Sequence, residues 1–309
     1  MTDLFCLGEP LVEFNQQPDG RFLLGFGGDV SNVAIAAARQ GVNAAMLTRV
    51  GQDRFGDDLR RLWRDEGVAD EHVHISTTEE TGLYFVTHDA QGHHFTYRRR
   101  GSAASRYSVG DLPKDALTSA KMFYASGISL AIGTNVRDAV LQGFRIVKQA
   151  GGLCAFDPNL RTALWPLDQA RDAIHAVMRS CDIALPGYDD AYQLTGLANP
   201  EDIVSFYHDL GASVVALTLG AAGVMISDGS ICQTLGPVPV KTKDATGAGD
   251  CFNGAFLAAL LRGLPACNAA RWANAAAALS TCGFGAVAPI PTLSQTRTHL
   301  EQTGDPHDH

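Results

Sequence analysis

Segments with the hydrophobic pattern of buried strands alternate with segments of helical pattern along most of this chain. The predicted strands cover residues 3–8, 44–50, 121–126, 153–157, 182–186 and 214–220, and the predicted helices cover 30–40, 56–66, 136–150, 168–179, 188–195, 250–262 and 266–281. Alternation of this kind builds right-handed βαβ units, so we expect an α/β fold with a mostly parallel sheet between two layers of helices. Ligands of such sheets bind beyond the carboxyl ends of the strands. Asp157, Gly187, Gly220 and the loop at 244–250 follow predicted strands and are candidates for that edge.

Two stretches depart from the alternation. Residues 9–26 alternate apolar and polar side chains around a turn at Pro18-Asp19-Gly20, and residues 81–100 have the pattern of a hairpin with its turn near Asp89–Gly92. Together they could form a small sheet that stands away from the main one. A lid over a site at the strand ends and an antiparallel extension of the main sheet are both compatible with this pattern.

Composition limits the classes of function. The chain has 309 residues, of which 46% are hydrophobic, and a formal net charge of -9. We expect one large domain over residues 1–304 and a polar tail at 305–309. The negative charge argues against binding to nucleic acid or to an anionic membrane, and no apolar run approaches a membrane span.

The cysteines and the N-terminus indicate the compartment. The chain begins like a strand, without the basic region of a signal peptide. Its cysteines are odd in number and form no CxxC pair, which is typical of reduced thiols in a cytoplasmic protein and not of a disulfide frame or a zinc site. They are Cys6, Cys154, Cys181, Cys232, Cys251, Cys267 and Cys282.

The sequence DATGAGDCFNGAF at 244–256 joins a glycine loop to a helix. Backbone N–H groups of Gly247, Ala248 and Gly249, together with the positive end of the helix dipole, would form an anion hole suited to phosphate. Asp250 is a carboxylate in the same turn, where it would repel a merely bound phosphate. It is well placed as a general base that takes a proton from a hydroxyl attacking that phosphate. The alternative is a tight turn in which Asp250 only caps the helix. The loop lacks the GKS or GKT ending of a Walker A motif.

These residues also resemble a known family. DATGAGDCFNGAF is similar to the C-terminal signature of the ribokinase-like, or PfkB, carbohydrate kinases, and GGDVSNVAIAAARQG at 27–41 is similar to their N-terminal signature. RVGQDRFGDDLRRLWRDEGV at 49–68 fits the block that follows. The resemblance covers nearly the whole chain and implies a three-layer αβα fold with a small β lid. It further implies phosphoryl transfer from ATP with Mg²⁺ to a sugar hydroxyl, Asp250 as the base, and in some members a monovalent cation near the loop.

Within this family the chain most resembles the 2-keto-3-deoxygluconate kinases. The similar segments are TGLYF at 81–85, YRRRGSAAS at 97–105, SGISLA at 126–131 and DPNLRTALW at 157–165. That resemblance implies a substrate site in which Gly28 and Asn32 contact sugar hydroxyls and Tyr84 packs on the sugar from the lid, with Asp250 at the reacting hydroxyl. Tyr97, Arg99 and Arg161 would surround the substrate carboxylate. A fructokinase or another sugar kinase of the family is the alternative, followed by a non-catalytic protein that binds sugar acids.

The arginine run at 98–100 is unusual in an acidic chain. If 93–100 is a strand, Tyr97 and Arg99 lie on one face, and Arg98 and Arg100 on the other. A guanidinium is the best donor for a planar carboxylate because its fork can bind two oxygens at once. A solvated basic edge strand is the alternative explanation.

The nucleotide residues rest on the resemblance. It implies that Thr218, Gly220 and Gly223 form the turn at the ATP phosphates and ribose, joined by Gly247 and Gly249, and that Asn274 lies beside the adenine. An ordinary glycine turn and a polar packing residue remain the alternatives.

The chain departs from the family at 187–190. The family often has Asn-x-x-Glu there, as a holder of Mg²⁺ and phosphate, but this chain reads Gly187-Tyr188-Asp189-Asp190. The metal ligands therefore stay unassigned, and nucleotide phosphates and water are expected to hold Mg²⁺. Exposed lid strands are edges that pair between subunits, so we expect a homo-oligomer formed through the lid.

Overall fold

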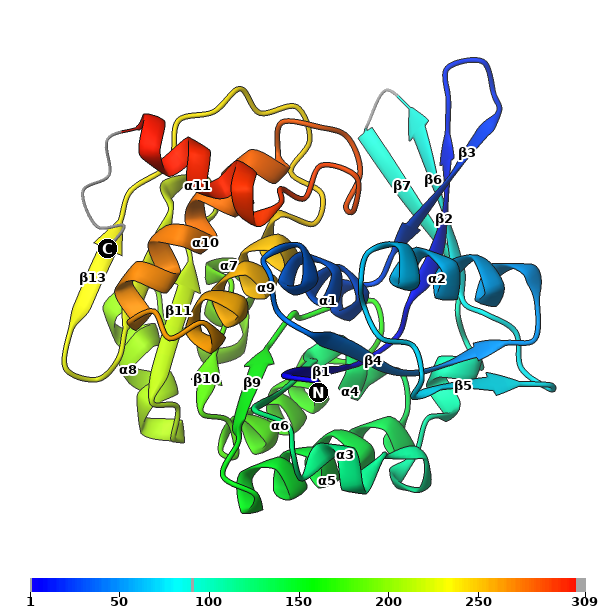
Figure 1. Cartoon of the computed structure of the whole chain (residues 1–309), viewed down its shortest axis with the longest axis horizontal. Coiled ribbons are helices and arrows are strands. Elements are labelled where there is room, and N and C mark those ends of the chain that lie inside the picture. Colours follow the sequence, from blue (N-terminus) through cyan, green and yellow to red (C-terminus); the bar gives the residue numbers. More distant parts are fainter. Residues whose placement is uncertain (1, 90–91, 304–309) are drawn as a thin grey trace.

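A central sheet carries the carboxyl-end edge where the sequence predicts the site. The computed structural model describes residues 2–89 and 92–303, and within these residues the sheet has nine strands (Figure 1). Their order across the sheet is β13 (Cys232–Leu235), β12 (Val224–Ser227), β11 (Val214–Thr218), β10 (Ile183–Ala184), β9 (Leu153–Asp157), β8 (Met122–Ser126), β1 (Leu4–Leu7), β4 (Ala44–Gly51) and β5 (Val73–Ser76). The strands from β11 to β5 pair in parallel, and β12 and β13 are antiparallel additions at one edge.

Helices cover both faces of this sheet. Alternate residues of β1 enter different cores, with Leu4 and Cys6 in one and Phe5 and Leu7 in the other. The first core is closed by α1 (Asp29–Arg39), α2 (Arg54–Asp65), α9 (Ala248–Leu261), α10 (Ala266–Ser280) and α11 (Leu293–Gln302). The second is closed by α3 (Lys114–Leu117), α4 (Gly127–Ala131), α5 (Thr134–Gln149), α6 (Leu167–Met178), α7 (Tyr188–Thr195) and α8 (Pro200–Leu210). The predicted three-layer α/β fold is therefore confirmed.

A second, smaller sheet stands off the central one (Figure 1). In the described residues its order is β3 (Phe22–Gly27), β2 (Leu11–Gln16), β6 (Leu83–Asp89) and β7 (Gly92–Arg98). We call this sheet the lid. The predicted segments 9–26 and 81–100 thus form one separate sheet, although its two hairpins join through a parallel pairing of β2 with β6. The hairpin turn at 90–91 and the polar tail at 305–309 lie outside the described residues.

Several elements differ from the predictions. The strand predicted at 182–186 is reduced to Ile183–Ala184, because Pro186 has no N–H to continue the ladder. No element was predicted at β5, β12, β13, α3, α4, α8 or α11. The start of helix α8 could have been predicted from the sequence, since the side chain of Asn199 caps the helix and Pro200 occupies its first turn. The short strands β5, β12 and β13 have four residues each, which is too few for a clear alternation. No helix in the described part of the chain is long and apolar enough to cross a membrane.

Helices α1 and α9 pack closely because Gly254 lies where they cross. A Cβ at Gly254 would lie 2.5 Å from the carbonyl oxygen of Val33 and 2.5 Å from the Cβ of Ala36. The close approach matters for the site because α1 carries Asn32 and α9 carries Asp250.

We therefore expect Gly254→Ala to lower the melting temperature, although alanine favours a helix by about 1 kcal/mol. Overpacking should cost about 1–3 kcal/mol and outweigh that gain. Gly249→Ala in the same helix is the matched control, because a Cβ there meets no atom within 4 Å. Equal melting temperatures for the two variants would contradict the packing argument.

Candidate active site

Asp250 lies in the first turn of α9, at the carboxyl-end edge of the sheet. The side chain of Asn32 in α1 donates a hydrogen bond from Nδ2 to Asp250 Oδ2, with a distance of 2.8 Å. Asn32 is buried and Asp250 is partly exposed, so one side of the carboxylate is fixed and the other can be reached by a ligand. The alternative role of Asp250 as a helix cap finds no support, since the N-cap residue is Gly247 and no side chain caps this helix.

The turn before α9 presents free backbone donors. Gly247 has a φ of 75°, and a Cβ there would lie 2.9 Å from the Cβ of Ala286, so a larger residue would be strained. The first i to i−4 bond of the helix is donated by Cys251 to the Gly247 carbonyl at 2.8 Å, which leaves the N–H groups of Gly249 and Asp250 ahead of it. Neither donates to another described group. The N–H of Ala248, by contrast, already donates to the Ala245 carbonyl at 3.1 Å. Of the N–H groups predicted to form an anion hole, that of Ala248 therefore already has an acceptor within the turn, whereas that of Gly249 has none among the described residues.

Three carboxylates and three amides form a closed ring at this edge. They come from α1, from α9 and from residues 157–159, which are the end of β9 and the loop after it. Each of these segments supplies one aspartate and one asparagine, and each asparagine donates to the aspartate of another segment. The pairs are Asn32 to Asp250 at 2.8 Å, Asn253 to Asp157 at 2.8 Å, and Asn159 to Asp29 at 3.0 Å. We call this set the Asp–Asn ring. The sequence analysis left out Asp29 and Asn253, although each lies three residues from a predicted site residue on the same helix.

The ring keeps Asp250 basic. Burial, together with the negative charge of Asp29, raises the pKa of Asp250 to about 7, against the hydrogen bond from Asn32 and the charge of Arg161. Burial also raises the pKa of Asp157 well above its ordinary value, as do the charges of Asp190 and Asp250. Amide donors hold the carboxylates together without adding positive charge, whereas lysine or arginine would lower their pKa values. A carboxylate with a pKa near 7 is well matched to general-base catalysis at neutral pH.

Aromatic residues of the lid face the same region. Tyr84 is buried and donates a hydrogen bond to Glu13, and its ring centroid lies 5.6 Å from that of Tyr97, its cross-strand neighbour, with the rings tilted by 35°. Burial and the charge of Glu13 raise the pKa of Tyr84, and Asp250 contributes to that rise. The guanidinium of Arg99 lies 5.6 Å from the centre of the Tyr97 ring. Strand β7 ends at Arg98, so Arg99 follows the strand and the alternation predicted over 93–100 does not extend to it. Arg99 also forms an ion pair with Glu9, a partner that the sequence analysis did not assign.

Arg161 is near enough to Asp250 for its charge to lower the pKa of that carboxylate. Its side chain is 52% exposed, with Nη1 4.0 Å from Asp190 Oδ2. Asp190 also accepts a hydrogen bond from the N–H of Leu160 at 2.9 Å, and burial raises its pKa. Gly187 provides no side chain here, as the sequence indicated. Gly28 lies at the start of α1, with a φ of 100° and a Cβ position only 2.4 Å from the carbonyl oxygen of Glu9.

The residues predicted to bind the nucleotide differ in how closely other atoms surround them. Thr218 ends β11, and a Cβ at Gly220 meets no atom within 4 Å, so this backbone faces open space. Gly223 has a φ of 100°, and its Cβ would lie 2.1 Å from the Leu235 carbonyl oxygen, which gives this glycine a packing role. Asn274 donates to the Gly236 carbonyl at 2.8 Å and so holds the loop that leads toward Asp250.

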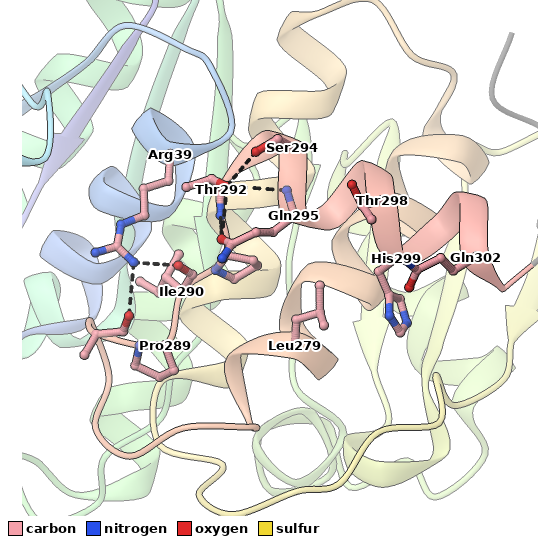
Figure 2. A pocket seen from close by; sticks show the side chains of 12 residues that line it. Arg39, Leu279, Pro289, Ile290, Thr292, Ser294, Gln295, Thr298, His299 and Gln302 are labelled. Atoms are coloured by element: carbon pink, nitrogen blue, oxygen red, sulfur yellow. Dashed lines mark hydrogen bonds between the residues drawn. The ribbon is translucent and has the colours of Figure 1, made fainter.

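A surface pocket of about 680 Å³ lies elsewhere, along α11 and the segment 288–292 (Figure 2). Arg39 borders it, but its guanidinium donates to Glu66 and to the carbonyls of residues 287, 288 and 290. None of the predicted site residues lines this pocket, and it offers no free charge to a ligand.

A partly exposed carboxylate with a raised pKa, a helix N-terminus with free N–H groups and a buried asparagine lie together at the carboxyl edge of the α/β sheet, an arrangement suited to phosphoryl transfer to an alcohol. The family model of the pfkB family carbohydrate kinases matches residues 1–293. The chain belongs to this family, and it is a sugar kinase that binds ATP.

Curated relatives name two kinds of substrate. A 2-dehydro-3-deoxygluconokinase of Thermoproteus tenax is 34% identical over 295 residues, covering 90% of this chain and 88% of the relative. A probable fructokinase-4 of Arabidopsis thaliana is 31% identical over 316 residues, covering 96% of each chain. The identities are too close to separate the two substrates.

Solved structures agree with the fold. A putative ribokinase II from E. coli in complex with ATP and Mg²⁺ has a TM-score of 0.89 at 27% identity, over 98% of this chain and all of that one. A fructokinase double mutant from Vibrio cholerae O395, bound to fructose, ADP and potassium ion, has a TM-score of 0.88 at 27% identity, over 97% and 98% of the two chains.

The donors present fit a nucleotide better than a protein-held metal. No group of three His, Cys, Asp or Glu side chains in the described part of the chain could hold a metal ion. Asp190 could contact a hydrated Mg²⁺ that nucleotide phosphates hold, in keeping with the reluctance of Mg²⁺ to lose water. Bound in this way, Mg²⁺ would supply charge neutralisation of the phosphates.

We expect kcat/KM to fall below about pH 7, because Asp250 must be ionised to accept a proton and burial raises its pKa to about 7. Asp29→Asn removes the second-largest cause of that rise and keeps an acceptor for Asn159. The acid limb of the pH profile should therefore move to lower pH in Asp29→Asn.

Asp250→Asn is the control for this assignment, with an expected loss in kcat of about 10²–10⁴-fold while the protein stays folded. An acid limb at the same pH in Asp29→Asn and the unmodified enzyme would contradict the assignment to Asp250.

Proposed function

We propose that this kinase phosphorylates the terminal hydroxyl of 2-keto-3-deoxy-D-gluconate with ATP. The observation that carries the proposal is the pair Tyr97 and Arg99, which places a cation and a hydroxyl-bearing ring beside Tyr84, a residue whose pKa the charge of Asp250 helps to raise. A neutral sugar needs no cation there, whereas a sugar acid has a planar carboxylate that suits a guanidinium. The naming of the Thermoproteus tenax relative agrees with this choice.

In the proposed reaction Asp250 removes the proton of the terminal hydroxyl as its oxygen attacks the γ-phosphorus. The bond from that phosphorus to the bridging oxygen breaks, and ADP leaves with the electron pair. N–H groups of Gly249 and Asp250 stabilise charge on the transferring phosphoryl group. Asn32 fixes Asp250 through its hydrogen bond and can contact a sugar hydroxyl, since its Oδ1 has no partner among the described residues.

The remaining ligand contacts are assigned as follows. Gly28 and Tyr84 contact the sugar, and Arg161 joins Arg99 at the carboxylate. Thr218, Gly220, Gly223, Gly247 and Gly249 bind the nucleotide, and Asn274 lies beside the adenine. The substrate is held between the lid and the central sheet, with both belonging to one domain.

A fructokinase is the second candidate. The Arabidopsis thaliana relative named as a fructokinase covers 96% of the chain at 31% identity, and fructose also offers a terminal hydroxyl. The pairing of Arg99 with Glu9 favours this candidate to some degree, because it satisfies the cation without a substrate carboxylate. A non-catalytic sugar-acid binder would have no need of Asp250.

Substrate choice is tested by ADP release with keto-deoxygluconate, its galacto epimer, fructose and gluconate. We expect the highest kcat/KM with a keto-deoxy acid, and a higher value on fructose would refute the proposal. Arg99→Lys keeps a positive charge beside Glu9 but loses the planar guanidinium that can donate to both oxygens of a carboxylate. This variant should lose about tenfold in kcat/KM on the keto acid, with little change on fructose.

The lid also offers a surface for a second copy of the chain. Its outer strands expose large apolar side chains, among them Leu23 at 62% and Phe95 at 54%. An exposed apolar edge of this kind pairs readily between subunits. The ATP requirement and the seven free cysteines agree with a protein that works in the cytoplasm.

We expect Leu23→Lys to shift the protein toward a monomer in sedimentation experiments, because a charge would replace apolar surface at the lid edge. Lys121→Ala, on the central sheet away from the lid, serves as the control. An unmodified protein that sediments as a monomer would refute assembly through the lid.

A further inference from the structure

Glu9 is a buried carboxylate that the proposed reaction does not use. It lies between β1 and β2 and is 1% exposed. Ser102 donates from Oγ to Glu9 Oε1 at 2.6 Å, and the guanidinium of Arg99 lies beside Oε2. The Arg99 side chain is 11% exposed, so both charges of this pair are largely removed from water.

The chain passes between the central sheet and the lid through four connecting segments, and Glu9 lies where these segments meet. Glu9 belongs to the first connection, and its carbonyl oxygen limits the space at Gly28 in the second. Its Oε1 lies 3.0 Å from the Cβ position of Gly82 in the third. Arg99 and Ser102 belong to the fourth. Glu9 therefore lies against all the connections at the base of the lid, with its main-chain carbonyl at the second and its carboxylate at the third and fourth.

An arginine in such a buried place requires a counter-charge, since an unpaired buried charge is strongly destabilising. Glu9 supplies this charge in the free enzyme. The Nε group of Arg99 still lacks an acceptor among the described residues, so the guanidinium can serve a second carboxylate. A sugar acid would thus share Arg99 with Glu9, and a neutral sugar would leave the pair unchanged.

We propose that Glu9 is a positioning residue that competes with the substrate carboxylate for Arg99 and so sets the preference of the site between acidic and neutral sugars. The inference rests on the proposed function, because it needs Arg99 to face the substrate. It predicts that neutralising Glu9 strengthens binding of an acid and leaves binding of a neutral sugar nearly unchanged.

The test uses Glu9→Gln, which keeps the size of the side chain, one oxygen that can accept from Arg99, and an amide that can donate to Ser102 Oγ. Dissociation constants for keto-deoxygluconate and for fructose are measured by calorimetry, with no need for turnover. The Kd of the keto acid should fall about tenfold, and the Kd of fructose should change less than about twofold. Ser102→Ala is the matched control, because it touches the same carboxylate but leaves its charge, and it should keep the ratio of the two constants.

Equal changes in both constants, or no change in their ratio, would overturn the proposal and leave Glu9 a purely structural residue. The same holds if the keto acid binds neither protein. Should Glu9→Gln fail to fold, the double variant Glu9→Gln with Arg99→Gln leaves no unpaired charge. That variant should bind the keto acid about tenfold more weakly than the unmodified enzyme, and unchanged binding would overturn the proposal.

The calorimetric test of Glu9 and the test of the proposed substrate can fail independently of each other. If the enzyme turns over fructose faster than the keto acid, the proposed substrate is wrong, but the two dissociation constants still test Glu9. If it turns over the keto acid and the ratio does not respond to Glu9→Gln, only the inference about Glu9 fails.

Discussion

The Asp–Asn ring is the constraint on which the active site depends. It joins α1, α9 and the loop after β9 through three carboxylate–amide hydrogen bonds, so none of these elements can move without breaking one of them. Three neighbouring carboxylates repel one another, and a lysine, an arginine or a metal ion usually offsets this repulsion. Such a cation would lower the pKa of Asp250 and make it a weaker base. The asparagine amides hold the carboxylates by hydrogen bonds without adding positive charge. The backbone at Asn159 adopts a φ of 30°, which is uncommon for a residue with a side chain and places its amide toward Asp29.

In the proposed function, the residues that transfer the phosphoryl group and the residues that select the sugar lie in different parts of the molecule. In the proposed reaction the ring and the turn at Gly249, which belong to the helices and one strand end of the central sheet, would supply a base and an anion hole for any alcohol. The lid supplies Tyr84, Tyr97 and Arg99, which differ in charge and shape from what a neutral sugar requires. This separation explains why relatives named for a sugar acid and for fructose match the chain about equally well. Most of the matched length is scaffold and shared chemistry, and the few residues that choose the substrate hardly change the identity.

The sequence predicted the scaffold well because its signals are local. Helix α1 ends one residue before the predicted boundary, and α9 begins two residues before its predicted start, as the glycines at 41 and 247 indicate. The turn that carries Asp250 was predicted from the same kind of local signal. The pairing of Glu9 with Arg99 was not, since the two residues are 90 positions apart and their contact depends on how the lid joins the sheet. The bond from the Ala248 N–H to the Ala245 carbonyl was not predicted either, because a sequence motif does not show hydrogen bonds within the turn.

The lid and the ring meet at α1, which follows directly from lid strand β3. Gly28 starts this helix against the carbonyl of Glu9, and the same helix carries both Asp29 and Asn32 of the ring. A shift of the lid that moved Glu9 would therefore press on the helix that holds Asp250. Because Glu9 carries a buried charge shared with Arg99, the binding of a substrate carboxylate at Arg99 would act at the one residue that touches all four lid connections. Recognition of the substrate and placement of the base are thus linked through a single short segment, residues 27–32, between the lid and the chemistry.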